Sequence, residues 1–523
     1  MMYIGKGLVL TRETLCRKAR ALMTLTLLVS AASLGAVAAS FSHAADASGG
    51  EEAAALSLKG CIELMLANNL DLKVEQYNPD MQEKEIVKEK AVFDPLARFS
   101  LQDEKWMISP TTLLNGVLRN KSYEQETINY DAGLSKRFLT GGVGDVSFTT
   151  DKYRTNSIWQ YESPTYFSQV VFSLNQPLLR NFGIDLNRSR IRISTNNKEI
   201  SRTQLEDRTA TMVAQLQQLY WNLYLSQQVL QVKKGSLQLA QDLMKRNEAL
   251  VEVGKLPAIE ILRAKTGVAS REEAVIVADN TVRDLEDLLR ERLNAPLRDR
   301  SVILMDKPVL REFQKREVSD YLGIALEKRP ECEQARMQLE NLKIAHAAAK
   351  NAMLPLFDVQ ASYGINATNP HYDRSIHGLD AGGDYSWLVG FKMEIPLGNR
   401  WAKNNYDKSS LELKKAETAL ASLQNKIELE IKEAIRQIET NQQRISATGE
   451  ARRLSETSLQ AEEERMSLGM STSVDVLRVQ EELAAAQAGE TKALIDYINS
   501  LDSLEAATGM LLENCRITIG EAS

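Results

Sequence analysis

The sequence predicts an α+β fold with an internal two-fold repeat, in which groups of amphipathic strands are joined to very long helices. A turn sequence that joins two predicted helices occurs twice, at 253–263 and 468–478. In each copy an acid stands six residues after a Gly and an Arg nine residues after it. A second pair of matching segments lies 260 residues apart, at 64–66 and 324–326, and further along each copy the hydrophobic period changes from helical to two.

The first 44 residues have the order of a secretory signal peptide. Basic residues between Lys6 and Arg20 precede an apolar run over 21–39, and Ser42-His43-Ala44 resembles a cleavage site. A transmembrane anchor is the alternative, but the run is rich in Ala and Ser and ends in this cleavage-like sequence. The mature protein is therefore predicted to leave the cytoplasm.

Composition narrows the function classes. The chain has 523 residues, a net charge of −6 and 26% charged residues, which excludes nucleic-acid binding by charge alone. After the signal peptide, Cys61, Cys332 and Cys515 remain, and their odd number and wide spacing predict packing residues rather than disulfides. No later apolar run has the length of a membrane-spanning helix, so entry into a bilayer would require a β-barrel.

The first repeat is predicted over 55–296. It begins with a helix over 56–92, broken at Pro95, and continues into a strand region at 96–176. A helix over 186–254 follows, with a predicted length of about 100 Å. Heptad-spaced leucines predict that it is buried along a narrow seam, as in a coiled coil; they are Leu216, Leu223, Leu230 and Leu237. The tip of the repeat is Gly254, and a return helix runs over 257–294.

The second repeat is predicted over 318–515, with a strand region at 356–395, a long helix over 404–469 and its tip at Gly469. Between the repeats, the segment 297–317 has no clear period and carries many charges. We expect this inter-repeat segment to wrap around the outside of the helices. Residues after Met510 are expected to do the same.

The strand regions alternate between apolar and polar residues. The clearest apolar positions are Ala97, Phe99, Leu101, Val170, Phe172, Leu174, Phe357, Val359, Ala361, Tyr363 and Ile365. Segments of about ten residues suit the wall of a membrane barrel with a polar lumen. A soluble sandwich also alternates, but it is not built from few strands beside very long helices. The fold class is therefore an α+β membrane protein, and because so few strands cannot close a barrel, the chain must oligomerise.

The number of strands stays open between four and six. Pro95 and Pro177 are 82 residues apart, whereas Pro355 and Pro396 are only 41 apart. The excess contains a tight-turn sequence at 139–143 with alternating segments on both sides, which predicts a second hairpin. Either this hairpin joins the wall, or it is an external loop that folds back, as Lys136 on its apolar face would favour.

The order of these elements resembles the TolC-like outer-membrane efflux family. Half helix, strands, a helix of about 100 Å, Gly turn and half helix occur twice, and Gln176-Pro177-Leu178 follows the first strand region. The resemblance covers residues 56 to about 515. It implies a homotrimer with a β-barrel in the outer membrane, continued by an α-helical coiled-coil barrel in the periplasm.

The function implied by this resemblance is a passive exit duct of a tripartite efflux or type I secretion system. The implied partners are a periplasmic adaptor protein, an inner-membrane transporter and outer-membrane lipid. No catalysis, cofactor or metal is implied. Three copies with four strands each give the twelve-stranded barrel of the family.

The resemblance also implies a periplasmic gate. Asp475 matches an acid that forms a ring at the narrowest point, and Glu260 is the matching acid of the first turn. The repeat mates Arg478 and Arg263 complete the set, although some relatives carry a second acid at the position of Arg478. An alternative role for Asp475 is a capping box with Thr472 at the start of its helix.

Two positions depart from the family pattern at this gate. Met466 and Ser471 stand where relatives have a tyrosine and an arginine that lock the gate, so we expect a different lock. The tips themselves are expected to dock the adaptor. They comprise Gly254, Lys255, Leu256, Pro257, Gly469, Met470, Ser471 and Thr472.

Two other function classes compete with the duct. An enzyme or metal site finds little support, because the four His residues have no Cys or acid at ligand spacing. His371 and His377 lie in a predicted loop between strands, where a solvated loop is expected rather than a metal site. A soluble periplasmic coiled-coil scaffold would share the helices and lack the transmembrane barrel.

Overall fold

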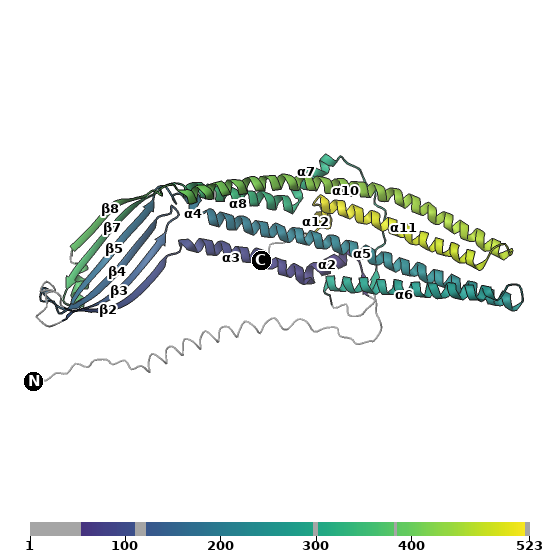
Figure 1. The fold of residues 1–523 in the computed structure, drawn as a ribbon, viewed down its shortest axis with the longest axis horizontal. Helices are drawn as coiled ribbons and strands as arrows, with labels where there is room; N and C mark the ends of the chain where they lie inside the picture. Colours follow the sequence, from purple (N-terminus) through teal and green to yellow (C-terminus); the bar gives the residue numbers. More distant parts are fainter. Residues whose placement is uncertain (1–53, 110–121, 296–301, 381–383, 518–523) are drawn as a thin grey trace, which may run out of the picture. The chain divides into compact units, whose positions relative to one another are not determined.

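The computed structural model describes residues 54–109, 122–295, 302–380 and 384–517, which belong to one compact unit (Figure 1). The predicted signal peptide lies outside the described residues. Long helices and one antiparallel sheet make up most of this unit. No described helix carries an apolar stretch long enough to span a bilayer.

The large sheet has six strands in the order β2-β3-β4-β5-β7-β8, and each neighbouring pair is antiparallel. The strands are β2 (Leu96–Ile108), β3 (Tyr123–Arg137), β4 (Val143–Thr155), β5 (Thr165–Pro177), β7 (Leu356–Asn369) and β8 (Asp384–Glu394). The second hairpin, β3–β4, is thus part of the sheet. This decides between the two strand counts in favour of six.

The register places the apolar positions of all six strands on one face. Phe99 lies beside Ala132, and in the same row Phe148 lies beside Val170. The row continues through Ile365 on β7. This face is exposed, with Phe99 88% and Phe391 70% accessible. Because side chains alternate along a strand, polar residues such as Arg98, Asp131 and Asp145 lie on the opposite face, although Lys136 and Lys152 share the apolar face.

The helices of the first half are α2 (Leu58–Asn68), α3 (Leu70–Lys90), α5 (Ser189–Glu252) and α6 (Ile259–Leu293), with a short α4 (Ile184–Asn187) before α5 and the 3-10 turn η1 (Ala91–Phe93) after α3. The prediction of one helix over 56–92 is wrong, because the chain breaks at Asn69. This residue has extended backbone, and its side chain accepts a hydrogen bond from the Leu72 amide at 3.1 Å. Asn69 therefore ends α2 and caps α3.

The helices of the second half are α7 (Val318–Lys328), α8 (Pro330–Ala352), α10 (Arg400–Ser467), α11 (Ser473–Ala507) and α12 (Leu511–Asn514). Here too a break separates two helices, at Arg329, and Pro330 begins the second of them. α10 has 68 residues. At 1.5 Å per residue its length is about 100 Å, as predicted.

The half helices lie along the long helices. α3 and α6 both pack against α5, whereas α8 and α11 both pack between α5 and α10 (Figure 1). Three of the heptad-spaced leucines, Leu216, Leu223 and Leu230, are buried in the core that α5 shares with α2 and α6. Leu237 is only partly buried. The seam predicted for α5 is therefore real over most of its length.

The inter-repeat segment is anchored to two helices. A three-residue strand, β6 (Val302–Leu304), pairs in parallel with β1 (Ala54–Leu56). The Tyr220 hydroxyl of α5 donates to the Leu56 carbonyl at 3.1 Å and accepts from the Asp306 amide at 3.2 Å. Tyr497 of α11 donates to the Arg311 carbonyl at 2.6 Å. These bonds hold the segment against α5 and α11.

The connection between β7 and β8 is not the loop that was predicted around His371 and His377. It contains a helix, α9 (Tyr372–Asp380), which packs against β5 and β7. Ser375 is buried in this contact, and its hydroxyl is 2.9 Å from that of Ser168. Small residues on one side of α9 allow this close approach, a signal too short to detect as a helical period.

Candidate functional site at the helical tips

The two predicted turns share one geometry. Gly254 and Gly469 have φ angles of 70° and 73°, a left-handed conformation that favours glycine. After each glycine, the next amide donates to a carbonyl five residues earlier, from Lys255 to Leu250 and from Met470 to Arg465, both at 2.8 Å. This is the hydrogen bond that closes a helix at a glycine C-cap. Both hairpins therefore turn in the same way.

Asp475 forms the predicted capping box. The Thr472 side chain accepts from the Asp475 amide at 3.4 Å, and the Asp475 carboxylate accepts from the Thr472 amide at 3.3 Å and from its hydroxyl at 2.7 Å. These hydrogen bonds, the side-chain bond foremost, lower the pKa of Asp475. The carboxylate is therefore charged at neutral pH while it caps α11.

Glu260, the matching acid of the first turn, has a different environment. It is only 8% exposed, and one oxygen accepts from Arg263 at 2.7 Å. Its other oxygen has no hydrogen-bond partner among the described residues. Arg478, the repeat mate of Arg263, instead bonds Glu482 at 2.7 Å. The structure thus brings together Glu260 and Arg263 but not Asp475 and Arg478.

The two departures from the family pattern are both occupied locally. Met466 packs against a buried cluster that includes Leu459 and Val476. Ser471 donates a hydrogen bond to Glu462 of the same hairpin. The cluster beside Met466 also contains Ala240 and Leu243 of α5, so Met466 lies at an apolar contact between the two hairpins, whereas the bond of Ser471 stays within its own hairpin.

Comparison with known families decides the identity of the fold. The model of the family described as outer membrane efflux protein matches residues 143–295 and 321–510. The chain belongs to this outer membrane efflux protein family. Its members are channel and transport proteins of the outer membrane, and in this fold the helices extend from the sheet into the periplasm. The resemblance inferred from the sequence is thus confirmed.

Solved structures of outer-membrane channels share the fold. The channel OprN is 14% identical, with 86% of this chain and 89% of that chain covered and a TM-score of 0.66. CmeC from Campylobacter jejuni is 15% identical, with 87% and 86% covered and a TM-score of 0.62. VceC from Vibrio cholerae is 15% identical, with 86% and 96% covered and a TM-score of 0.63. No functionally curated protein matches the sequence.

In this outer membrane efflux protein, the contact between the two hairpins depends on residues that the sequence did not single out. Arg271 of α6 donates to the Leu477 carbonyl of α11 at 2.7 Å and to the Ser236 hydroxyl of α5 at 3.0 Å. Desolvation by burial lowers the pKa of Arg271. Gly267 leaves room for Leu477, because a Cβ there would lie 2.8 Å from its Cδ1.

A second bond joins the hairpins nearer the tip. The Asn247 side chain of α5 donates to the Ser473 hydroxyl at the start of α11 at 2.8 Å, and both residues are buried. Arg271 and Asn247 lie in charged and polar stretches of their helices, where one more polar residue gives no periodic signal. Only the packing of α5 and α6 against α11 reveals their partners.

The tips expose apolar side chains beyond these contacts. Val253 is 66%, Leu262 60%, Leu468 73% and Met470 66% exposed. Of the predicted docking residues, Gly254, Lys255, Pro257, Gly469, Met470 and Thr472 are exposed, whereas Leu256 and Ser471 are partly buried. Within the described part of the chain, no group of three or more His, Cys, Asp or Glu side chains could hold a metal ion.

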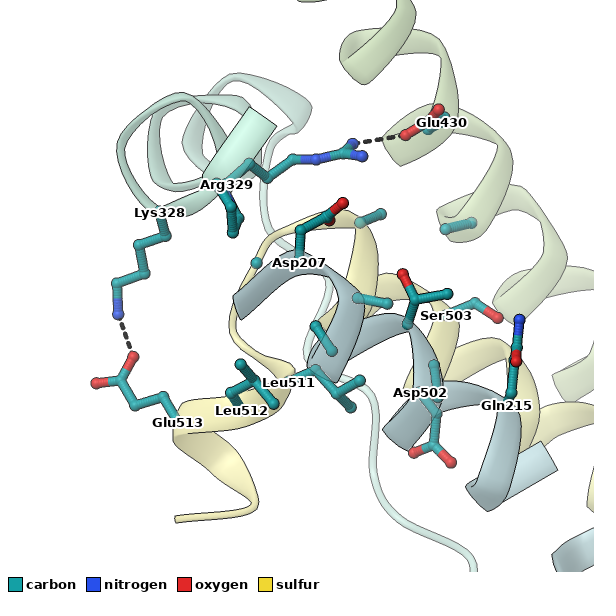
Figure 2. A pocket seen from close by; sticks show the side chains of 18 of the residues that line it. Asp207, Gln215, Lys328, Arg329, Glu430, Asp502, Ser503, Leu511, Leu512 and Glu513 are labelled. Carbon is teal, nitrogen blue, oxygen red and sulfur yellow. Dashed lines mark hydrogen bonds and ion pairs between the residues drawn. The ribbon is translucent and has the colours of Figure 1, made fainter. Parts of the chain in front are cut away.

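A cavity of about 1150 Å³ with a mixed polar and apolar lining lies where α8 begins and α11 ends, between α5 and α10. Figure 2 shows Arg329 reaching Glu430 and Lys328 reaching Glu513 at this junction. Burial raises the pKa of Asp502 in this cavity to about 6. Ion pairs and a buried carboxyl thus accompany the apolar cluster at this junction, which includes Ala325, Cys332 and Leu504. At the corresponding junction beside Asn69, Leu289 and Leu293 are buried.

Proposed function

We propose that three copies of this chain form an exit duct in the outer membrane, which passively conducts substrates of a tripartite efflux or type I secretion system. The observation that carries the proposal is the six-stranded sheet, with one exposed apolar face and unpaired outer strands β2 and β8. Unpaired edges and an apolar face of this size require both a partner strand and lipid. Further copies would provide the partner strands, and the outer membrane would provide the lipid.

The helices support the same assembly. Each chain places two long helices and two rows of half helices side by side, so three copies would supply twelve columns around a central tunnel. The repeated turn geometry and the matching breaks at Asn69 and Arg329 support an origin of the columns in two repeats, 55–296 and 318–515. The cleaved signal peptide over 1–44 belongs to this proposal, because an outer-membrane protein must first be exported.

The tips are the proposed periplasmic end. Exposed apolar side chains at Val253, Leu262, Leu468 and Met470 support docking to a periplasmic adaptor, which would connect the duct to an inner-membrane transporter. Asp475 would place three carboxylates around the tunnel axis at this end. Glu260, buried and paired with Arg263, would support the tip without facing the tunnel.

The mass of the mature protein in mild detergent tests the assembly. We expect a trimer, and the adaptor and the transporter should be retained when the trimer is captured from gently solubilised membranes. A monomer under these conditions would contradict the closure of the sheet. A soluble scaffold, the alternative weighed from the sequence, would remain in solution without detergent, and membership of an outer-membrane family does not support it.

A further inference from the structure

We infer that the wall of this duct has eighteen strands and that its outer opening admits larger hydrated polymers than a twelve-stranded wall would. The inference rests on the proposed trimer and adds the size class of its cargo. Each chain contributes six strands, and three times six gives eighteen. The residues that add the two extra strands form the hairpin β3–β4, and three observations show that this hairpin is built into the sheet.

First, the hairpin is paired on both sides over nearly its full length. β3 pairs with β2 from Tyr123 to Ser135, and β4 pairs with β5 from Val143 to Tyr153. A ribbon folded back outside the wall would leave β2 and β5 paired with each other. No such pair exists among the described strands.

Second, a polar network on the inner face joins β2 to both strands of the hairpin. Arg98 of β2 donates to Asp131 of β3 at 3.3 Å and to Asp145 of β4 at 2.9 Å. To reach β4, the Arg98 side chain crosses β3 above Gly133, where a Cβ would lie 2.9 Å from its Nε. The Thr149 hydroxyl adds a bond to Asp131 at 3.0 Å. The glycine leaves room for the arginine to bridge β2 and β4, so these strands pack as parts of one sheet.

Third, the turn of the hairpin is seated in the joint between the sheet and the helices. Gly141 has a φ angle of 95°, and a Cβ there would collide with the Asn181 carbonyl and lie 2.8 Å from the side-chain Nδ2 of Asn187. The Thr140 hydroxyl donates to the Gln176 side chain at 2.8 Å, and the Thr140 carbonyl accepts from the Gly183 amide at 3.2 Å. This turn is held at the helical end of the sheet.

The apolar face is continuous across the inserted strands. Leu134 lies beside Val146, and both are exposed, as a surface in contact with lipid requires. Lys136, which argued for an external loop, is the second-last residue of β3. At that place a lysine can extend its amine beyond the apolar band.

The consequence follows from the geometry of barrels. The diameter grows about linearly with the number of strands, and barrels of about 16 to 18 strands leave an aqueous channel. The inner face carries Arg98 neutralised by Asp131 and Asp145. Such a lumen would be wide and polar, so it would not restrict the cargo as a narrower wall does.

Polymer access to a single cysteine tests the width. Ser173 of β5 faces the lumen between Asp145 and Ser362, and Ser173→Cys is introduced with Cys515→Ser in the full-length protein. The matched control deletes residues 123–156. Because two strands are removed together, Leu101 then stands opposite Ser168 and every remaining residue keeps its face. Maleimides carrying polyethylene glycol of increasing mass are added outside intact cells.

We expect a small maleimide to label both proteins equally, whereas a large polymer should label the deletion variant at least about tenfold more slowly. If both proteins are trimers and every polymer labels them at the same rate, the inference of a wider wall is overturned. The mass of each protein is measured in parallel, because loss of the trimer in the full-length protein would contradict the proposed function instead.

A second measurement covers the case in which the deletion variant does not assemble. In the full-length protein, cysteines at Leu134 and Phe148 should react with a bilayer-soluble probe and be shielded from an aqueous one. A cysteine at Ser147, on the opposite face of β4, should show the reverse. Aqueous labelling of both Leu134 and Phe148 would remove the hairpin from the wall and overturn the inference.

Discussion

Two acids at equivalent positions have different physical roles in this protein. Asp475 caps α11 and is still partly accessible, whereas Glu260 is buried beside Arg263. A buried carboxylate needs a partner, because an unpaired charge away from water is costly. An accessible carboxylate at a helix start is stabilised by its cap and can still act on passing ions. Only the accessible carboxylate, Asp475, suits a selectivity ring.

Replacement of Asp475 by Ala tests that ring. In a reconstituted bilayer, Asp475→Ala should weaken the preference for cations and the block by multivalent cations, because three poorly screened carboxylates would be lost. Loss of the cap should also cost about 1 kcal/mol of stability. Glu482→Gln, which removes the exposed partner of Arg478, serves as control. Selectivity that is the same in both variants would leave Asp475 with its capping role alone.

Arg271 is expected to hold the two hairpins together at the tip. Arg271→Ala leaves the Leu477 carbonyl and Ser236 hydroxyl without this donor, at a cost of about 1 to 3 kcal/mol, and should raise the conductance of the reconstituted duct. Arg271→Lys should rescue it poorly, since an ammonium cannot reproduce the planar fork. Arg283→Ala, an exposed side chain of the same helix, is the control. Unchanged conductance of Arg271→Ala would exclude it as a lock.

Asp502 makes stability depend on pH. Burial, with Glu505, raises its pKa from 3.8 to about 6, and Arg311 opposes the shift. The folded state therefore binds a proton that the unfolded state releases, so this residue's contribution is present below about pH 4 and lost as pH rises through about 6.

Asp502→Asn should consequently raise the free energy of unfolding by up to about 3 kcal/mol at about pH 8 and leave it nearly unchanged at about pH 4. Denaturation of the detergent-solubilised protein at both pH values measures this. Glu456→Gln, an exposed acid of α10, should show no such difference. An equal effect of Asp502→Asn at both pH values would refute the assignment.

At the scale of elements, most of the architecture could be predicted from periodicity. Heptad leucines indicated α5, and strict alternation indicated the strands, because both patterns extend over many residues. The break at Asn69 was missed, since one asparagine within a helical pattern becomes a cap only through tertiary contacts. Asn69 also donates to the Arg292 carbonyl at 2.9 Å, a bond across 223 residues that no local pattern contains.

The candidate site was predictable to a similar extent. The glycine turns and the capping box at Asp475 are local motifs, and the structure has both. The Leu477 carbonyl bound by Arg271 and the Ser473 hydroxyl bound by Asn247 lie on another hairpin, and their positions depend on how α11 packs against α5 and α6. Contacts between helices that lie far apart in the sequence therefore could not be predicted from local sequence patterns.

The turn of the inserted hairpin provides a test at this scale. Gly141→Ala combines a left-handed backbone with a collision against the Asn181 carbonyl, so we expect a loss of at least about 1 to 2 kcal/mol. The yield of trimer after extraction, measured by mass in detergent, should fall. Gly323→Ala in α7 meets no atom within 4 Å and should be neutral or stabilising. Equal yields would mean that the turn does not hold the hairpin.

At the scale of the whole molecule, the sheet and the helices divide the chain into parts with different demands. The sheet exposes apolar side chains on one face and one unpaired edge on each of β2 and β8, which the proposed trimer would pair with neighbouring copies. The helices bury the α5 seam within one chain, as Leu216 and Leu223 show, but α3 exposes apolar side chains such as Val74 and Met81. Both the sheet and α3 are therefore expected to gain stability from neighbouring copies, whereas the α5 seam is formed within each copy.

The hairpin β3–β4 enters and leaves the sheet at its outer end, and only its turn at Gly141 touches the helical joint. Two strands added as a unit leave the direction of β5 unchanged, so the chain returns to α5 at the same place with or without them. A change in this hairpin would therefore alter the bore of the proposed outer opening and leave unchanged the helical tips that we propose dock the adaptor. Proteins that share these helices could in this way conduct cargoes of very different width.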